Sequence, residues 1–348
     1  MKVTLIYGGK SAEHDVSILS AFSILKAIYY NYYEVQAIYI TKTGQWLKGP
    51  LYKKAPETEE ELHLTVTNAQ EINPSDIKEE NSVIFPVLHG PNGEDGTVQG
   101  LFEVLNMPYV GAGVLASACA MDKIVAKQLF QQAGIPQLPY VSVIRQGYQE
   151  DPETIYAKCE GTLIYPMFVK PANMGSSVGI SKANSRDELT KAIEEAFRYD
   201  RRVIVEQGIE ARELEVAILG NDEIRTTEAG EIVKDVAFYD YESKYIDNKV
   251  ELQVPATVSD ELHKKMRDYA KKAYIALDGS GLSRCDFFVT ANDEIFLNEV
   301  NTLPGFTPFS MYPLLWQHMG INYSDLLEEL IQLAKLRFEK KQQIELGQ

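Results

Sequence analysis

The first third of the chain alternates short apolar runs with a segment of helical periodicity. Three apolar runs are predicted strands, at residues 3–7, 35–40 and 83–88. A helix is predicted over residues 17–30. Strands that alternate with helices indicate a mostly parallel α/β sheet, and ligands on such sheets gather beyond the carboxyl ends of the strands. Gly8-Gly9 and His89-Gly90 follow two of these strands, so part of a site is expected there.

The following segments predict irregular structure and then a domain boundary. Residues 48–80 are polar and acidic with scattered prolines, which favours surface loops and a short helix. One helix is predicted over residues 116–133, because Gly134 and Pro136 follow it as stop signals. We therefore expect the first domain to end near this helix.

The remainder of the chain mixes strand and helix patterns. Strands are predicted at residues 167–169, 203–206, 213–219, 287–290 and 294–300. Helices are predicted at residues 185–198, at 259–277 and from about 324 onward. Ser185 and Glu188 form a capping-box pattern at the first of these helices. The last two strands are expected to form a hairpin around Asn292-Asp293.

Length and charge narrow the function classes. The chain has 348 residues, and domains commonly hold roughly 100–200 residues, so two or three lobes are expected. It carries 34 basic and 50 acidic residues, a net charge of −16. Such a surface repels phosphate backbones and argues against nucleic-acid binding. A nucleotide site remains compatible with this charge where the basic residues converge on one cleft.

The cysteines and the lengths of the apolar runs indicate the compartment in which the protein is expected. Cys119, Cys159 and Cys285 are widely spaced and form no CxxC pair, so each is predicted to be a small buried apolar residue. Residues 1–9 resemble a strand rather than a signal peptide. No apolar run approaches the roughly 20 residues that span a bilayer. We expect a cytoplasmic protein.

The strongest local signal for chemistry is the loop from Lys170 to Gly179, with the sequence Lys-Pro-Ala-Asn-Met-Gly-Ser-Ser-Val-Gly. Its small residues let backbone N–H groups approach phosphate oxygens, and Lys170 can offset their charge. The loop lacks the GKS or GKT ending of a Walker A motif. Taken alone, it is equally compatible with an ordinary Gly/Ser turn between strands.

A second signal lies on the predicted hairpin. Glu299 and Asn301 are two residues apart in a strand, so both side chains point to the same face. Asp286 on the neighbouring strand can complete an oxygen-only site, which suits Mg²⁺ rather than zinc. Acidic residues on strands are ordinarily solvated, and the trio gains weight only beside Arg284 and the turn from Asn301 to Gly305.

Six motifs in order along the chain point to one family. They are Gly8-Gly-Lys-Ser-Ala-Glu13-His-Asp-Val-Ser17, Leu88-His-Gly-Pro-Asn-Gly-Glu-Asp-Gly96, Met121-Asp-Lys123, the Lys170 loop, Phe238-Tyr-Asp-Tyr-Glu-Ser-Lys-Tyr245 and Glu299-Val-Asn-Thr-Leu-Pro-Gly305. Together they resemble the D-alanine–D-alanine ligases of the ATP-grasp superfamily, over nearly the whole chain. Only residues 48–80 lack a clear match.

The resemblance implies an α/β fold with three lobes that clamp ATP. The expected boundaries are 1–120 for an amino-terminal α/β substrate lobe, 121–212 for a central ATP-grasp lobe and 213–348 for a carboxy-terminal lobe with the metal site and a lid loop. It also implies these nucleotide and metal contacts: Lys123, Lys170 and Ser177 at the phosphates, Glu206 beside the adenine, Glu213 at the ribose, and Asp286, Glu299 and Asn301 at two Mg²⁺ ions, with Mn²⁺ as a substitute.

The resemblance assigns the substrate end as well. Glu13 is expected to anchor the ammonium group of the first D-alanine, with Ser176 and Tyr245 around it, and His89 to line the same pocket. Arg284 and the backbone N–H of Gly305 are expected to stabilise charge on the first carboxyl group. Lys244, Ser310 and the backbone beside Met311 are expected to hold the second carboxylate. From the residues alone, Glu13 could instead cap a helix and His89 could be a turn histidine.

The activity implied is the ATP-dependent ligation of two D-alanines through a D-alanyl phosphate, for peptidoglycan precursors, by a cytoplasmic homodimer without membrane or nucleic-acid partners. Residues 233–248 are the expected lid. D-alanine–D-lactate ligation is the alternative on the same scaffold, and the Lys244-Tyr245 pair favours the dipeptide. Another carboxylate–amine ligase and a non-catalytic nucleotide sensor are the other readings; the sensor requires lost lysine or metal ligands, which are all present.

Overall fold

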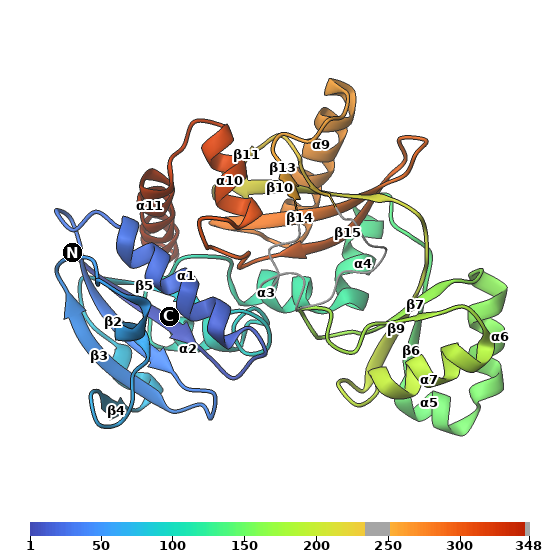
Figure 1. Cartoon of the computed structure of the whole chain (residues 1–348), viewed down its shortest axis with the longest axis horizontal. Coiled ribbons are helices and arrows are strands. Elements are labelled where there is room, and N and C mark those ends of the chain that lie inside the picture. Colours follow the sequence, from blue (N-terminus) through green and yellow to red (C-terminus); the bar gives the residue numbers. More distant parts are fainter. Residues whose placement is uncertain (234–250, 345–348) are drawn as a thin grey trace.

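The structure is a computed structural model that describes residues 1–233 and 251–344. Figure 1 shows three sheets side by side, each with its own helices, in an elongated molecule. The amino-terminal sheet has the spatial order β4 (Gln70–Ile72), β3 (Trp46–Tyr52), β2 (Glu34–Ile40), β1 (Lys2–Gly8) and β5 (Ser82–Val87). The strands predicted at 3–7, 35–40 and 83–88 are confirmed as β1, β2 and β5.

The centre of the amino-terminal sheet is parallel and its edge is antiparallel. β1 lies between β2 and β5 and is parallel to both, and its buried apolar side chains fill the core on both faces. Helix α1 (His14–Ala27) follows β1, and α2 (Thr97–Val104) follows β5. The prediction of loops over residues 48–80 is wrong in part, because β3 and β4 extend the sheet. Between them stand two 3-10 turns, Glu59–Leu62 and Pro74–Ile77.

The predicted single helix at 116–133 is two helices, α3 (Val114–Met121) and α4 (Lys123–Gln132). Asp122 separates them with extended backbone angles, φ −83° and ψ 102°. Its carboxylate accepts hydrogen bonds from the backbone N–H groups of Ile124 and Val125 at 3.1 and 3.0 Å. A side-chain cap of this kind competes with continued helix, which explains the break.

The central sheet is antiparallel and stands apart at one end of Figure 1. Its spatial order is β6 (Tyr140–Ile144), β9 (Arg202–Gln207), β7 (Met167–Pro171) and β8 (Ser181–Ala183). Its helices are α5 (Arg145–Glu150), α6 (Pro152–Thr162) and α7 (Arg186–Ala196). The Ser185 hydroxyl caps α7 as predicted, whereas the Glu188 carboxylate accepts from Asn184 N–H at 2.8 Å instead of closing the box on Ser185.

The carboxy-terminal sheet is antiparallel and carries the predicted hairpin. Its spatial order is β13 (Glu251–Gln253), β12 (Gly230–Val233), β10 (Arg212–Leu219), β14 (Leu282–Val289) and β15 (Ile295–Asn301), with β11 (Arg225–Thr226) also paired to β10. Helix α9 (Asp260–Ala276) packs on one face together with α3 and α4. The break at Asp122 therefore lies between the carboxy-terminal core and the central sheet.

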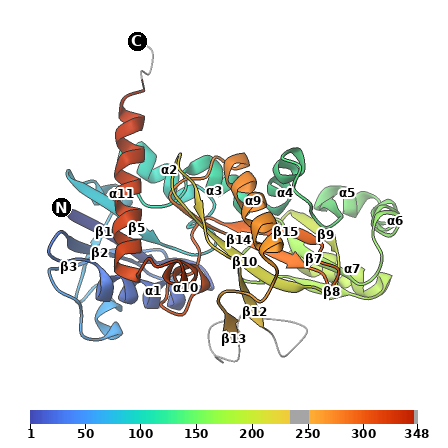
Figure 2. The same ribbon diagram turned by 90° about the horizontal axis from the view of Figure 1, so that it is seen from above.

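The last two helices pack against the carboxy-terminal and the amino-terminal sheets. α10 (Met311–His318) covers β10, and α11 (Tyr323–Gln342) lies against the amino-terminal sheet, as Figure 2 shows. The Tyr29 hydroxyl donates to Asp325 Oδ1 at 2.7 Å across this contact. Cys159 and Cys285 are buried as predicted, and Cys119 is half-buried. Within residues 1–233 and 251–344 there is no helix with the length and apolarity that crossing a membrane requires.

Candidate active site

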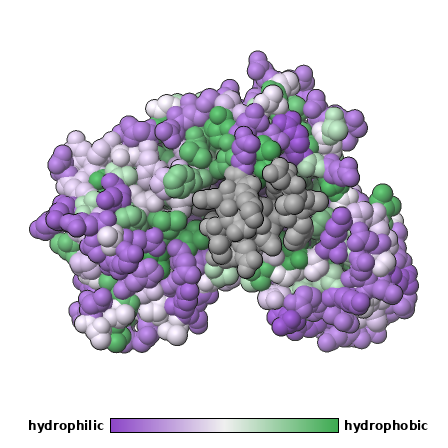
Figure 3. Space-filling model, viewed as in Figure 1, coloured by the Kyte–Doolittle hydropathy of each residue, from purple (hydrophilic) through white to green (hydrophobic). Residues whose placement is uncertain are grey.

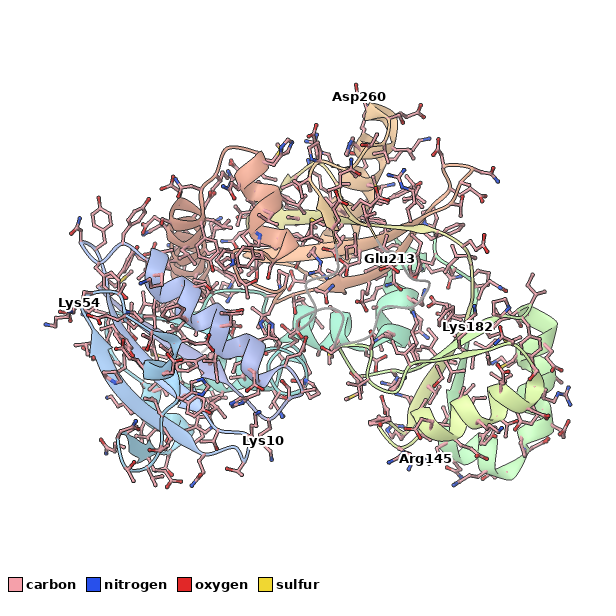
Figure 4. All side chains as sticks on the ribbon, viewed as in Figure 1. Lys10, Lys54, Arg145, Lys182, Glu213 and Asp260 are labelled. Atoms are coloured by element: carbon pink, nitrogen blue, oxygen red, sulfur yellow. The ribbon has the colours of Figure 1, made fainter. Side chains whose placement is uncertain are left out.

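A cleft of about 820 Å³ lies where the three sheets approach one another. Thirteen of the predicted site residues line it: Glu13, His89, Lys123, Lys170, Ser176, Ser177, Glu206, Glu213, Arg284, Asp286, Glu299, Asn301 and Gly305. Figure 4 labels Glu213 on the carboxy-terminal sheet and Lys182 on the central sheet, which line opposite sides of the cleft. On the face drawn in Figure 3, hydrophobic residues gather toward the middle and hydrophilic ones cover both ends.

The Lys170 loop leaves β7 and returns to β8 with an unusual backbone. Ser176 and Ser177 both have positive φ angles, 51° and 57°, which non-glycine residues seldom adopt. The Lys123 ammonium donates to Met174 O at 2.6 Å and so fixes the loop to the start of α4. The buried Ser176 hydroxyl has no hydrogen-bond partner among the described residues. The loop therefore brings Ser176 and Ser177 to the cleft with a backbone conformation that suits anion binding.

Two lysines hold Glu206 in the wall of the cleft. Lys170 Nζ lies 2.7 Å from Glu206 Oε2, and Lys127 Nζ lies 2.5 Å from Glu206 Oε1. Burial raises the pKa of Glu206, but the two ammonium groups outweigh burial and lower this pKa to about 2. Glu206 is therefore ionised, and a hydrogen-bond acceptor only, throughout the physiological range.

Register in the carboxy-terminal sheet brings the acidic residues together. Glu215, Asp286 and Glu299 are cross-strand neighbours on β10, β14 and β15. The pairing of β14 with β15 shifts between Asp286 and Phe287, and this bulge leaves Asn298 as an extra residue on β15. The alternation of buried side chains is therefore interrupted between Leu297 and Val300, and Asn298 and Glu299 both line the cleft. Asn298 Oδ1 lies 3.5 Å from Lys170 Nζ.

The donors at this position fit a hard cation. Asp286 and Glu299 supply carboxylate oxygens, and Asn301 donates its amide nitrogen to Asp286 Oδ2 at 2.9 Å, which leaves its amide oxygen for a ligand. An oxygen-only set of this kind suits Mg²⁺. No group of three His, Cys, Asp or Glu side chains converges as a metal site in the described parts of the chain. The set fits a cation that also takes oxygens from a bound phosphate.

Glu13 enters the cleft from the amino-terminal sheet. A β-carbon built on Gly90 would lie 3.4 Å from Glu13 Oε2, and one built on Gly175 would lie 3.9 Å from it, so the carboxylate lies between the two loops. Glu13 occupies the N-cap position of α1, but its side chain makes no cap hydrogen bond. The helix-capping alternative for this carboxylate is therefore wrong.

Hydrogen bonds fix helix α1 against the carboxyl ends of β1 and β5. Ser17 Oγ accepts from Gly8 N–H at 2.7 Å and donates to Val87 O, so one hydroxyl joins the carboxyl ends of β1 and β5. Gly8 has φ +90°, and a β-carbon there would lie 2.2 Å from Ile40 O, which explains the glycine. The two predicted strand ends thus meet beside Glu13.

His89 and Glu94 belong to the loop that follows β5. His89 Nδ1 is 3.2 Å from Leu303 O, and burial lowers the pKa of His89, so the neutral ring donates to that carbonyl. Its Nε2 is buried without a partner among the described residues. Burial, followed by the charge of Glu13, raises the pKa of Glu94 to about 8. Burial and the neighbouring negative charge therefore both favour the protonated form of the Glu94 carboxyl group.

Comparison with known proteins agrees with this geometry. Sequence models described as "D-ala D-ala ligase N-terminus" and "D-ala D-ala ligase C-terminus" match residues 2–112 and 129–332. The chain belongs to the D-alanine–D-alanine ligase family. The family assignment and the ATP-grasp α/β fold that the sequence predicted are confirmed.

Relatives match over nearly their whole length. The D-alanine–D-alanine ligase of Enterococcus hirae is 64% identical, covering 98% of both chains. That of Enterococcus faecalis is also 64% identical, covering 97% of this chain and 100% of the relative. The solved D-Ala:D-Ser ligase VanG of Enterococcus faecalis is 37% identical, with a TM-score of 0.85, and covers 96% of this chain and 99% of its own. The D-alanine–D-alanine ligase of Coxiella burnetii is 32% identical at the same TM-score, covering 98% and 96%.

Two further residues predicted for this ligase site, Ser310 and Met311, lie close to the cleft without lining it. Ser310 Oγ would lie 3.0 Å from a β-carbon on Gly305, and it bonds Thr307 N–H at 3.1 Å. Met311 begins α10 and is buried against Gly230. Neither Ser310 nor Met311 lines the cleft itself. Lys244 and Tyr245, and the lid expected at 233–248 apart from its first residue, lie outside the described residues.

Four residues of the site were missed from the sequence: Glu94, Lys127, Glu215 and Asn298. Glu215 had a usable signal, because it stands two residues after Glu213 in a strand and so faces the same side. Lys127 stands one helical turn after Lys123, which predicts a shared face. Glu94 lies inside a quoted motif without an assigned role. Asn298 had no signal, because only the bulge turns it to the cleft.

Proposed function

We propose that the cleft joins two D-alanines into D-alanyl-D-alanine at the expense of ATP, through a D-alanyl phosphate, as a step in making peptidoglycan precursors. The observation that carries the proposal is the convergence of three elements on one cleft: the Lys170 loop, the Arg284–Asp286–Glu299 face, and Glu13. The names of the relatives at 64% identity support the same activity. D-alanine–D-lactate ligation gains no support from these comparisons.

Activation of the first carboxylate needs alignment and charge neutralisation. A carboxylate is a poor electrophile, and phosphorylation by the γ-phosphoryl group of ATP gives it a good leaving group. Lys123 and Lys170 would hold the phosphates together with the backbone of Ser177, while Glu213 would accept hydrogen bonds from the ribose hydroxyls. Arg284 and the N–H of Gly305 would stabilise charge on the carboxyl group as it reacts.

Asp286, Glu299 and Asn301 would hold two Mg²⁺ ions, which would neutralise charge on the transferring phosphoryl group. Asp286 also keeps Arg284 beside the reacting centre, because its two carboxylate oxygens bind the guanidinium. Asp286 therefore has a positioning role as well as a ligand role.

The first D-alanine would lie between the amino-terminal loops and the Lys170 loop. Glu13 would pair with its ammonium group, and the Ser176 hydroxyl, which has no partner among the described residues, would accept from the same group. His89, held by Leu303 O, would form the adjacent wall. The second amine, once deprotonated, attacks the acyl carbon, an amide bond forms and inorganic phosphate leaves.

The second D-alanine would bind toward Gly305 and α10. Ser310 and the backbone at Met311 would hold its carboxylate, together with Lys244, while Tyr245 would complete the first pocket. D-alanine is favoured as the second substrate because the relatives at 64% identity are named for it, whereas the D-Ala:D-Ser ligase is 37% identical.

The proposal also includes the lobe boundaries, the compartment and the oligomeric state. The lobes would comprise residues 1–120, 121–212 and 213–348, each with one of the three sheets. The chain would act in the cytoplasm, where ATP is available, and as a homodimer.

Isotope transfer tests the acyl phosphate. D-alanine with ¹⁸O in its carboxyl group is incubated with the enzyme, ATP and Mg²⁺, and the inorganic phosphate is examined by mass spectrometry. Because one carboxylate oxygen attacks phosphorus and leaves with it, one ¹⁸O per dipeptide should appear in phosphate. Dipeptide formation with unlabelled phosphate would contradict the mechanism, and ATP turnover without dipeptide would contradict the proposed reaction.

A further inference from the structure

Lys127 lies behind the cleft wall and has no role in the reaction as described above. It stands on α4, one turn after Lys123, and its ammonium contacts Glu206 Oε1 at 2.5 Å. Both side chains are only 3% exposed. The Lys127 ammonium also lies 5.4 Å from the ring centroid of Tyr140, on the strand paired with the strand of Glu206. A buried lysine held in this way has one fixed carboxylate partner.

Glu206 pairs with two lysine ammonium groups, and of these two lysines only Lys170 lines the cleft. Lys170, on Oε2, also begins the loop with the two left-handed serines. If Lys170 turns to a bound phosphate, Lys127 still neutralises Glu206, and the carboxylate stays ionised in a buried wall. Without Lys127, Glu206 must retain Lys170 or take up a proton, because an isolated buried carboxylate is costly.

The wall beside Glu206 suits a flat, partly apolar ring. Phe168 is the cross-strand neighbour of Glu206, and Leu138 and Ile209 also line the cleft. An ionised carboxylate at the edge of an apolar slot accepts hydrogen bonds and donates none. The carboxylate of Glu206 therefore favours a base whose exocyclic amine faces it. It disfavours a base with a carbonyl oxygen at the same ring position, because two acceptors repel each other.

We propose that Lys127 is a positioning residue for nucleotide selection: its ion pair with Oε1 holds Glu206 as a fixed acceptor that selects an amino-substituted purine and leaves Lys170 to the phosphates. This inference rests on the proposed use of ATP and deepens it. Lys127 touches neither base nor phosphate, and it acts through Glu206.

The test compares Lys127→Met, which removes the charge at similar length, with Lys127→Arg, which keeps it. Gln128→Met is the matched control, because Gln128 is exposed on the same helix. ATP and inosine triphosphate, which has a carbonyl in place of the amine, are compared by displacement of a fluorescent ATP analogue and by KM and kcat. In Lys127→Met, ATP binding and the preference for ATP should each fall about tenfold, as loss of one charge-assisted contact implies, with a smaller change in kcat.

Lys127→Arg should restore most of the preference, and Gln128→Met should keep all of it. A Lys127→Met protein that is less stable but keeps the wild-type preference for ATP would overturn the proposal and leave a structural role only. If Lys127→Met does not fold, Glu206→Gln decides, because its amide can donate to a carbonyl and should lose the preference; an unchanged preference would overturn the proposal. Binding of ATP without any ligation would contradict the proposed function alone.

Discussion

Arg284 and Asp286, two residues apart on β14, face the same side of the sheet and form a two-point ion pair. Arg284 Nε lies 2.7 Å from Asp286 Oδ1, and Arg284 Nη2 lies 2.7 Å from Asp286 Oδ2. Arg284 Nε is also 3.0 Å from Glu215 Oε2. The planar guanidinium is thereby held in one orientation beside Glu299 and the turn that ends at Gly305. A substrate carboxyl group would meet a cation that is already oriented.

Arg284→Lys should therefore impair catalysis although it preserves the charge. Lysine cannot form the two parallel hydrogen bonds, so the orientation is lost. We expect kcat/KM for D-alanine to fall about 10²-fold, the usual effect of losing one positioned donor in a reaction of this kind. Steady-state kinetics measures this. Arg212→Lys is the control, because Arg212 makes a similar two-point pair with Glu231 outside the cleft and its change should leave turnover intact.

Glu299→Ala should abolish Mg²⁺-dependent turnover and leave the fold intact. Glu299 faces the cleft, so its removal deletes an oxygen ligand without opening a cavity in the core. Product formation is measured across a range of Mg²⁺ concentrations, together with thermal unfolding. Glu294→Ala, at an exposed glutamate before the same strand, should behave as wild type. Near-normal activity in folded Glu299→Ala would refute the metal assignment.

Ser17→Ala should destabilise the amino-terminal sheet. The hydroxyl of Ser17 accepts from Gly8 N–H and donates to Val87 O, and its removal leaves buried backbone groups unpaired. We expect a loss of about 2–3 kcal/mol in the free energy of unfolding, measured by urea denaturation. Ser20→Ala on the same helix should change stability little, because the buried Ser20 hydroxyl has no hydrogen-bond partner in the described parts of the chain. Equal effects would contradict this account of α1.

Glu206 should make folding stability depend on pH in the acid range. Burial raises the pKa of Glu206, but the charges of Lys170 and Lys127 lower it by more. The net result is a pKa lowered from 4.5 to about 2. The folded chain thus binds this proton less tightly than the unfolded chain does. The contribution of Glu206 to stability is fully present above about pH 4.5 and declines as the pH falls toward 2. The difference in unfolding free energy between wild type and Glu206→Gln should narrow below pH 4.5; a constant difference from pH 6 downward would be inconsistent with the lowered pKa.

Much of the site follows from local rules that the sequence obeys. The ends of β1 and β5 were predictable because apolar runs stop at Gly8 and His89, and ligands bind at such ends. Alternation in a strand placed Glu299 and Asn301 on one face, and the same rule applies to Glu213 and Glu215. These inferences need only the period of a strand.

Other parts depend on contacts between distant segments. Asp122 caps α4 and ends the helix before it, and Arg202 on β9 and Asn173 in the Lys170 loop bind the same carboxylate. Asn298 faces the cleft only because a bulge changes the register, and Lys127 meets Glu206 only after α4 packs beside the central sheet. Lys170 and Glu206 are 36 positions apart in the sequence, and Arg202 and Asp122 are 80 apart. The periodicity of a single helix or strand does not predict contacts over such separations.

The most direct test of the account is a mass-spectrometric product assay with ATP, Mg²⁺ and D-alanine, with and without excess D-lactate at neutral pH. The account predicts D-alanyl-D-alanine and ADP in both mixtures, because the cleft activates one D-alanine and the second amine is the preferred nucleophile. Mainly D-alanyl-D-lactate in the mixed reaction would contradict the choice of second substrate. No product of either kind, from a protein that binds ATP, would contradict the ligase activity itself.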